Sequence, residues 1–359
     1  MKMDKYRVLV INPGSTSTKI AVFEDEEPLF KESLQHSVEE LAPYGGVIAQ
    51  YDFRKEAILK ALKARNFDLK TLSAIAGRGG VVKPIESGVY HVNDALVADL
   101  KTGYNGGMHA SNLGGLLARD LGDELGIPSF IADPVSVDEM EPLARITGLP
   151  EITRTSVFHA LNQKAMARKV ATEQLGKKYE EINLIVVHLG GGVSVGAHKR
   201  GRAIDVNNAT DGDGPFSPER CGTLPLGPYR RMVFKINDEK QIYKKLVGGG
   251  GLVAHLGTND AREVERRINA GDEKAHLYYE AMAYQIAKEI AGMASVLKGD
   301  VDGIVITGGM ARSKILVNWI RERVDWIAEF FLMPGEFEVE ALAWGALRVL
   351  RGEEQSKEY

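Results

Sequence analysis

Two segments of the chain carry residue types that bind phosphate groups. In the first, the apolar run 8–11 leads into the turn NPGSTST at 12–18; in the second, the apolar run 185–187 leads into HLGGG at 188–192. Turns rich in Gly, Ser and Thr expose backbone N–H groups and hydroxyls at their tips, and such groups bind anions. Two of these turns facing one another could hold a polyphosphate.

The two segments look like one hairpin used twice. At one fixed offset Asn12 falls on His188 and Gly14 on Gly190, and each turn leads into a second short apolar run. The first segment is not a P-loop, because it lacks the Lys-Ser/Thr pair and continues as a strand at 20–23, where a P-loop needs a helix. A polar hairpin tip is the alternative for either segment alone, and the second copy argues against it.

Two arginines and one aspartate stand in settings that suit charged ligands. Arg78 lies at a strand end in GRGG at 77–80, and Arg220 lies in SPERCG at 217–222. A planar guanidinium suits bidentate binding of carboxylate or phosphate. Asp133 ends an apolar strand, a frequent place for Mg²⁺ ligands, although a cap of a helix or turn is an equally good interpretation.

The remaining reactive side chains give weaker signals. His159 lies at the start of a helix, where a lone histidine is usually a capping or packing residue. No His/Cys cluster has the spacing of a zinc site. Cys221 has no suggestive histidine partner and is interpreted as a small neutral residue.

Composition narrows the class of protein. The chain has 359 residues, of which 44% are hydrophobic and 26% charged, and its net charge is −4. These values favour about two ordinary domains and argue against nucleic-acid or anionic-membrane partners. The single cysteine fits a reducing, cytoplasmic compartment, and neither a signal-peptide core nor a run of membrane-spanning length is seen.

Strands and helices alternate along the chain, which indicates an α/β protein. The duplicated hairpin suggests two similarly folded domains with a cleft between them. The predicted elements are hairpins at 6–23 and 184–198, strands at 72–76, 129–132 and 303–307, and helices near 52–65, 109–125, 157–175, 260–270, 274–298 and 338–351. We expect a loop broken by Pro28 and a frayed tail after Glu353.

Taken together, these segments resemble the acetokinase family of acetate, propionate and butyrate kinases. The matching segments run along essentially the whole chain in the family's order: 10–19, 77–81, 130–133, 158–159, 188–192, 219–222, 260–262 and 307–309. The resemblance implies two duplicated ribonuclease-H-like domains of the sugar kinase/Hsp70/actin superfamily, with an ATP cleft between them. It implies a first domain at 1–150 completed by a C-terminal helix at about 341–359, and a nucleotide-binding domain at 151–340.

Departures from acetate kinases make the chain most similar to butyrate kinases. Where acetate kinases typically read HRVVH, the second valine helps to wall the acyl pocket and is matched here by Gly80. Its absence is expected to admit a longer alkyl tail. Gly191 replaces the asparagine of HLGNG, and the segment 310–313 replaces IGEN, which leaves the nucleotide contacts less well matched.

The resemblance implies reversible transfer of the γ-phosphoryl group of ATP to butanoate, with Mg²⁺, giving butanoyl phosphate and ADP. The implied catalytic residues are Arg78, Asp133, His159 and Arg220. Phosphate contacts fall on Asn12, Ser15, Ser17, Lys19, His188, Gly190, Gly191 and Gly192. The adenosine site comprises Asp260, Ala261, Arg262, Gly308 and Gly309, and the acyl pocket Gly79, Gly80 and Phe158. Mg²⁺ is assigned to Asp133, Asn12 and a late glutamate, Glu338 or Glu340, of which Glu340 is taken.

Other interpretations stay open at this point. The chain could phosphorylate isobutyrate or another short acid. It could also be a nucleotide-driven clamp of the Hsp70/actin kind that phosphorylates nothing, which would leave Arg78 and Arg220 unexplained. The expected partners are a small-molecule acid and further copies of the chain, in a homodimer or higher homo-oligomer.

Overall fold

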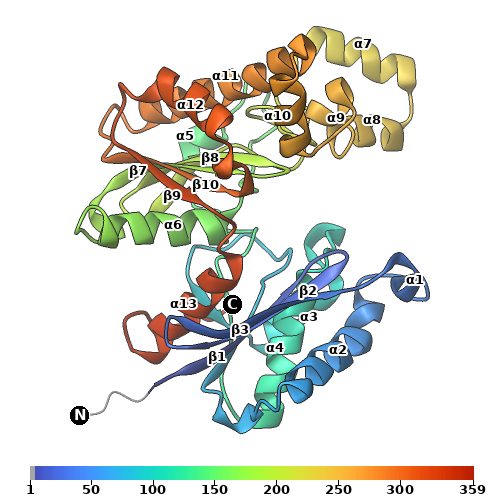
Figure 1. Cartoon of the computed structure of the whole chain (residues 1–359), viewed down its shortest axis with the longest axis vertical. Coiled ribbons are helices and arrows are strands. Elements are labelled where there is room, and N and C mark those ends of the chain that lie inside the picture. Colours follow the sequence, from blue (N-terminus) through green and yellow to red (C-terminus); the bar gives the residue numbers. More distant parts are fainter. Residues whose placement is uncertain (1–4) are drawn as a thin grey trace. The chain divides into compact units, whose positions relative to one another are not determined.

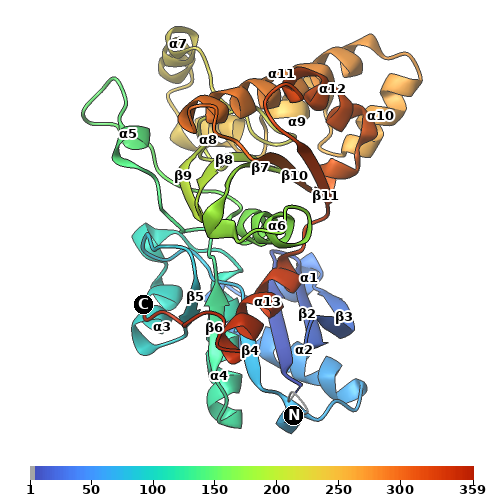
Figure 2. The same cartoon turned by 90° about the vertical axis from the view of Figure 1, so that its left-hand side faces the viewer.

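The computed structural model describes residues 5–359, and these form two compact units. Unit 1 consists of Met1–Val137 and Phe337–Tyr359, and unit 2 of Asp138–Glu336. Figures 1 and 2 show that each unit is built on one β-sheet with helices packed on it. Unit 1 is therefore completed by the C-terminal end of the chain.

The sheet of unit 1 has the strand order β3-β2-β1-β4-β6-β5. β1 pairs antiparallel with β2 and parallel with β4, and β4 pairs parallel with β6. The carboxyl ends of β1, β4 and β6 therefore meet at one edge of the sheet. The bounds are β1 Arg7–Pro13, β2 Ser17–Glu24, β3 Glu27–Gln35, β4 Ala74–Gly77, β5 Val89–His91 and β6 Ser129–Ala132.

The sheet of unit 2 repeats this topology in the order β11-β10-β7-β8-β9. β7 and β1 are each seven residues long, and their turns leave the residues 190–192 and 14–16 between paired strands. One hairpin used twice is thus confirmed, as is the α/β fold with duplicated domains. The bounds are β7 Asn183–Leu189, β8 Val193–Lys199, β9 Arg202–Val206, β10 Gly303–Gly308 and β11 Phe330–Pro334.

Helices cover both faces of the sheet in unit 1. Leu9 and Ile11 of β1 belong to the core cluster that α2 (Tyr51–Ala64) and α4 (Asn112–Leu125) also form. Because side chains alternate along a strand, Val8 and Val10 point to the opposite face. Helix α13 (Glu338–Leu350) contacts β1, β4 and β6 there. The smaller helices are α1 Val38–Leu41 and α3 Asp94–Thr102.

Unit 2 has the same layering. Helix α6 (Ala160–Glu173) packs on β7 and β10, and α11 (Glu273–Val296), backed by α12 (Lys314–Val324), covers the other face (Figure 1). The sheet side chains facing α11 and α12 form one buried apolar cluster with them. The remaining helices are α5 Pro142–Arg145, α7 Leu226–Ile236, α8 Glu239–Leu246, α9 Gly251–Leu256 and α10 Ala261–Asn269.

Two expectations about unit 1 are wrong. The segment around Pro28 is strand β3, where the proline is the second residue of an edge strand and its missing N–H is tolerated. The tail after Glu353 is not frayed, since Lys357 N donates to Val89 O at 2.7 Å and Lys357 O accepts from His91 N at 3.0 Å. The last residues thus pair with β5 at the other edge of the sheet.

Among residues 5–359, no helix is both long and apolar enough to cross a membrane.

Candidate active site

The strand-end cluster of unit 1 consists of Asn12, Arg78 and Glu338. Ile11 pairs with Gly77 across β1 and β4, so the residues that follow them lie side by side at the strand ends. Glu338, on the first turn of α13, accepts from Asn12 Nδ2 at 2.9 Å and pairs with Arg78 Nη1 at 2.5 Å. Arg78 Nη1 also lies 3.4 Å from Asn12 Oδ1. The guanidinium is therefore held by two side chains that come from opposite ends of the sequence.

Electrostatics favour the ionised form of Glu338. Burial alone would raise its pKa, but the Arg78 charge and the hydrogen bonds from Asn12 and Arg78 outweigh burial and hold the pKa below its usual value. Lys19 adds a smaller effect in the same direction. His109 lies in the same field: burial and then the Arg78 charge lower its pKa, which favours a neutral ring. The cluster is thus a fixed anion–cation pair beside a neutral imidazole.

The two candidates for the late glutamate, Glu338 and Glu340, differ in what they contact. Glu340 pairs with Lys31 Nζ at 2.6 Å, and no contact joins it to Asn12 or Arg78 among the described residues. Glu338 and Glu340 are two positions apart on a helix and so point in different directions. Glu338 is the late glutamate of this strand-end cluster.

We expect Glu338→Gln to reduce the kcat of phosphoryl transfer from ATP to a short carboxylate by about 10-fold or more. The reason is that Arg78 loses its charged partner while the hydrogen bonding is retained. Glu340→Gln is the matched control and should leave kcat within about 2-fold, since surface ion pairs contribute little. Steady-state rates of the two purified variants test this. Equal losses in both variants would contradict the distinction between them.

A buried arginine holds the first turn in shape. Gly14 N donates to Ser17 O at 2.7 Å, which closes the turn. Arg54 of α2 is fully buried and donates to Ser15 O at 3.1 Å and Ser17 O at 2.9 Å. Sequence reasoning missed Arg54, because an arginine inside an amphipathic helix gives no signal of its own. The hydroxyl of Ser15 remains on the exposed tip of the turn.

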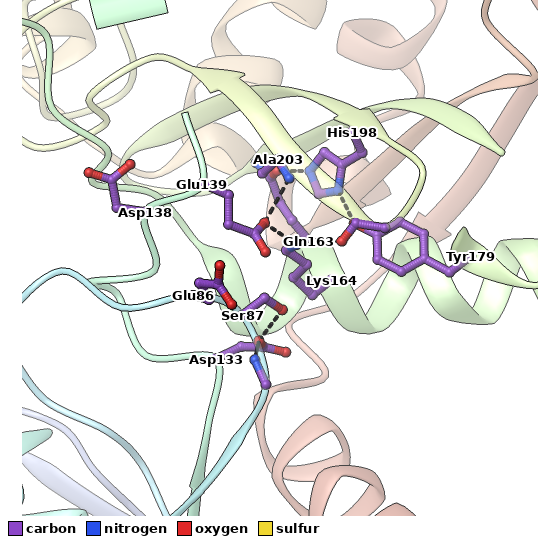
Figure 3. A network of polar contacts seen from close by, with 12 residues as sticks. Glu86, Ser87, Asp133, Asp138, Glu139, Gln163, Lys164, Tyr179, His198 and Ala203 are labelled. Carbon is purple, nitrogen blue, oxygen red and sulfur yellow. Dashed lines mark hydrogen bonds and ion pairs between the residues drawn. The ribbon is translucent and has the colours of Figure 1, made fainter. Parts of the chain in front are cut away.

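Asp133 follows β6 at the same sheet edge. Its φ is 37°, in the left-handed region that aspartate enters more readily than most residues. Its Oδ1 accepts from Ser87 Oγ at 2.6 Å and from Gly88 N at 2.9 Å (Figure 3). A buried, fixed carboxylate suits Mg²⁺, which often uses one or two carboxylates and completes its shell with water and phosphate oxygens. No group of three or more His, Cys, Asp or Glu with metal-binding geometry occurs within residues 5–359.

Gly80 does not open a space for an alkyl tail in the direction of its missing side chain. A Cβ at this position would lie 2.2 Å from Asn112 Oδ1 and 2.5 Å from Asn112 Cα. Asn112 is fully buried, and its Oδ1 accepts from Val81 N while its Nδ2 donates to Leu100 O. Gly79 is equally tight, with Pro134 Cβ 2.7 Å from its ideal Cβ. Gly80 thus lets the Arg78 loop pack against α4, and Gly79 lets it pack against Pro134. The inference of a longer acid from Gly80 loses its physical basis.

We therefore expect Gly80→Ala to destabilise the fold by about 1–3 kcal/mol through overpacking. The losses in kcat/KM should be similar for acetate and butyrate. Gly292→Ala is the control, because its Cβ would meet nothing within 4 Å in an exposed part of α11, and it should stabilise by about 0.4–1 kcal/mol. Urea unfolding measures both. A Gly80→Ala variant of unchanged stability and altered acid preference would restore the pocket interpretation.

Two stacked histidines lie against the glycine turn 190–192 of unit 2. The rings of His159 and His188 have centroids 3.9 Å apart and an interplanar angle of 11°. An ideal Cβ at Gly190 would lie 3.1 Å from His188 Nε2, and one at Gly192 would lie 3.7 Å from His159 Cε1. The missing side chain of Gly190 thus lets the turn approach the His188 ring closely, and Gly192 lies within ordinary contact distance of His159.

The loop of Arg220 is tied to the same turn. Ser217 Oγ donates to Gly191 O at 2.6 Å, and Glu219 N donates to the same oxygen at 3.3 Å. Arg220 Nη1 lies 3.4 Å from Glu219 Oε2. Arg220 Nε is buried and has no hydrogen-bond partner among the described residues. An unpaired buried donor is costly, and a bound anion would satisfy it.

The residues assigned to adenosine have local structural roles as well. Asp260 is the N-cap of α10 and pairs with the exposed Arg262 at 3.0 Å. Gly308 has a φ of 93°, and its ideal Cβ would lie 2.3 Å from Leu189 O, so only glycine fits there. Gly309 has open space around its ideal Cβ. Phe158, assigned to the acyl pocket, is buried next to His159.

A buried polar network in unit 2 includes His198 and two neighbouring residues of α6, Gln163 and Lys164 (Figure 3). His198 is bonded through both ring nitrogens, to Tyr179 OH at 2.6 Å and to Gln163 Oε1 at 2.9 Å. Lys164 follows Gln163 on α6, is fully buried, and pairs through Nζ with Glu139 Oε2 at 2.5 Å. Sequence reasoning did not find this network, because its members are far apart in the chain.

Burial, and then the charges of Lys164 and Arg168, lower the pKa of His198 well below its usual value, so the folded protein keeps it neutral. Below about pH 6.5 the unfolded chain binds a proton here that the folded chain does not. The free energy of unfolding should therefore decrease as the pH is lowered through this range, by up to about 1.4 kcal/mol per pH unit. His198→Gln should flatten that slope, as urea unfolding between pH 7.5 and 5 would reveal. Parallel profiles for the two proteins would contradict this.

The predicted site residues form two sets. In unit 1, Asn12, Arg78 and Asp133 lie at the ends of neighbouring parallel strands, and Glu338 contacts the first two of them. In unit 2, His159, His188 and Arg220 surround the turn 190–192, whereas Asp260 and Arg262 lie at the start of α10.

Comparisons with known proteins match both the sequence and the fold. Residues 151–325 match the model of the acetokinase family. Acetate kinase from Porphyromonas gingivalis superposes with a TM-score of 0.78 at 20% identity, covering 96% of this chain and 100% of that one. Propionate kinase from Francisella tularensis superposes with a TM-score of 0.74 at 18% identity, covering 95% of this chain and 98% of that one. Acetate kinase from Entamoeba histolytica superposes with a TM-score of 0.75 at 16% identity, covering 94% of this chain and 98% of that one. The sequence similarity to the acetokinase family thus covers the segment 151–325, and nearly the whole chain has the fold of acetate and propionate kinases.

Proposed function

We propose that this chain is an ATP-dependent kinase for a short-chain carboxylate, with butanoate as the acid. It would form butanoyl phosphate and ADP reversibly. The observation that carries this proposal is the surroundings of the turn 190–192, where an imidazole and the loop of Arg220 meet exposed backbone. A hydrogen-bond donor, a cation and backbone N–H groups are what a phosphoryl group in transfer requires.

The proposed reaction needs positioning more than acid–base chemistry. A carboxylate is already ionised at neutral pH, so no residue has to remove a proton from it. The difficulty lies in bringing one anion in line with another and in spreading the charge of the transferring group. Arg220 would neutralise that charge, and His159 would donate a hydrogen bond to one of its oxygens.

Unit 1 would supply the acid-binding cation. Arg78 is oriented by Asn12 and Glu338, so its free edge is pre-organised for a substrate carboxylate. Asp133 has the chemistry to hold Mg²⁺, which when bound would neutralise charge on the phosphates. Asn12 and Glu338 hold Arg78, and we assign them that role before any role toward the metal.

Support for butanoate itself comes from the sequence resemblance. Gly80 does not contribute, for the steric reason given above. Phe158 is the residue of the proposed acyl pocket that remains, and it is buried in unit 2. The length of the acid is therefore the part of the proposal that the experiment must decide.

The test is trapping of acyl phosphate by hydroxylamine with ATP, Mg²⁺ and acids of two to six carbons, including isobutyrate. We expect hydroxamate to form, with the highest kcat/KM for butyrate. If kcat/KM is highest for acetate, propionate or isobutyrate, the proposed kinase activity stands and the proposed acid is wrong. ATP hydrolysis that no acid accelerates, without hydroxamate, would contradict the proposal.

A further inference from the structure

A continuous chain of side-chain hydrogen bonds reaches His159 from the interior of unit 2. Tyr179 OH lies 2.6 Å from His198 Nδ1, and His198 Nε2 lies 2.9 Å from Gln163 Oε1. Gln163 Nε2 lies 2.8 Å from Ser194 Oγ, which lies 2.8 Å from His159 Nδ1. The four residues behind His159 are at most 2% exposed, so water does not compete for these bonds. Figure 3 shows Tyr179, His198 and Gln163 with the bonds that join them.

The orientation of the Gln163 amide sets the direction of this chain. Gln163 Nε2 also lies 3.0 Å from Ser194 O, and a backbone carbonyl can only accept. The amide nitrogen must therefore face Ser194, and Oε1 must face His198. Because Oε1 only accepts, the proton of His198 is on Nε2, and its Nδ1 accepts from Tyr179 OH. Every donor up to this point is directed toward Ser194.

The hydroxyl of Ser194 determines which nitrogen of His159 carries the proton. Its oxygen already accepts from Gln163, and His159 Nδ1 is the one other partner that residues 5–359 offer it. If His159 Nδ1 carried a proton, the buried Ser194 hydroxyl would have no acceptor, which is costly. Ser194 therefore donates to Nδ1, and the proton of neutral His159 is on Nε2.

His188 is held in the opposite form. Asn162 Nδ2 donates to Glu336 O, which again can only accept, so Asn162 Oδ1 faces His188. His188 Nδ1 lies 2.7 Å from that oxygen and must carry a proton. The stacked pair thus combines a ring with Nδ1 as acceptor and a ring with Nδ1 as donor.

We propose that Ser194, Gln163 and His198 are positioning residues that fix His159 as the Nε2–H tautomer, so that Nε2 donates a hydrogen bond to an anionic ligand. The identity of that ligand as the transferring phosphoryl group rests on the proposed function. The tautomer itself does not. A partner on one imidazole nitrogen that fixes the proton on the other is an established device in catalysis.

The experiment is ¹H–¹⁵N NMR of the full-length protein with ¹⁵N-labelled histidine rings, with His159→Gln and His188→Gln used for assignment. We expect an unprotonated Nδ1 and a protonated Nε2 for His159, and a protonated Nδ1 for His188. In Ser194→Ala, the backbone carbonyl still holds Gln163. The His198 signals should therefore stay unchanged, whereas His159 should populate both tautomers and kcat should fall about 10-fold.

A buried serine in the other unit provides the matched control. Ser129→Ala, on β6, should change neither the His159 signals nor kcat. A protonated Nδ1 on His159 in the wild type, or an unchanged His159 tautomer in Ser194→Ala, would overturn the proposal. If the protein gives the expected spectra but forms no hydroxamate, the proposal on the His159 tautomer is supported and the proposed kinase function is contradicted.

Discussion

Replacing Arg220 by alanine is expected to lower kcat by about 10³-fold or more, the usual effect of losing a charge-stabilising arginine in phosphoryl transfer. The residue is placed for that role, because its loop is fastened to Gly191 O by Ser217 and Glu219. Its Nε is buried and has no hydrogen-bond partner in the described part of the chain, so a bound anion would supply one. Rates with saturating ATP and acid provide the measurement.

Two further variants define the result. Arg220→Lys should recover little, because a point charge cannot replace the planar fork of donors. Arg321→Ala removes an exposed arginine paired with Asp325 on α12 and should leave kcat unchanged. If Arg220→Ala keeps kcat within about 10-fold of the wild type, Arg220 does not serve phosphoryl transfer.

Lys164→Met is expected to destabilise the protein by about 3–5 kcal/mol, because it leaves the Glu139 carboxylate buried without its cation. The ammonium is completely buried, 2.5 Å from Glu139 Oε2 and 2.9 Å from Gly201 O. The same carboxylate oxygen accepts from Ala203 N at 2.8 Å, so the pair also joins α6 to the β8–β9 turn. Urea unfolding measures the loss.

The controls separate charge from packing. Lys169→Met on the same helix removes a partly exposed pair with Glu173 and should change stability little. Lys164→Met with Glu139→Gln should recover part of the loss, since the uncompensated charge is gone and the amide oxygen still accepts from Ala203. A double variant as unstable as Lys164→Met would assign the loss to packing instead.

The sequence predicted those features that short patterns determine. The β-branched runs before the turns 12–18 and 188–192 became β1 and β7, and the helices at 274–298 and 338–351 agree with α11 and α13 within about two residues. Parallel pairing then brought Asn12 and Arg78 to one sheet edge. Short apolar runs were sufficient here, because strands that are buried on both faces are almost continuously hydrophobic.

The remainder depended on contacts that no local pattern contains. Glu338 reaches Asn12 across 326 positions of sequence, so the choice between Glu338 and Glu340 required the rotation of α13. Gly80 appeared to leave space, but Asn112 fills it. Ser194 and Gln163 have no signal in their own segments, and their effect on His159 depends on which atoms face each other.

The division of unit 1 between the two ends of the chain has a consequence for synthesis on the ribosome. Unit 2 is contiguous and emerges complete before α13, which covers the Val8 and Val10 face of the first sheet. At about 5–20 residues per second, that face stays uncovered for roughly 10–40 s while Asp138–Glu336 is translated. During this interval Arg78 also lacks Glu338. The first unit to begin synthesis is thus the last to be completed, and its exposed apolar face is where a nascent chain would need protection from aggregation.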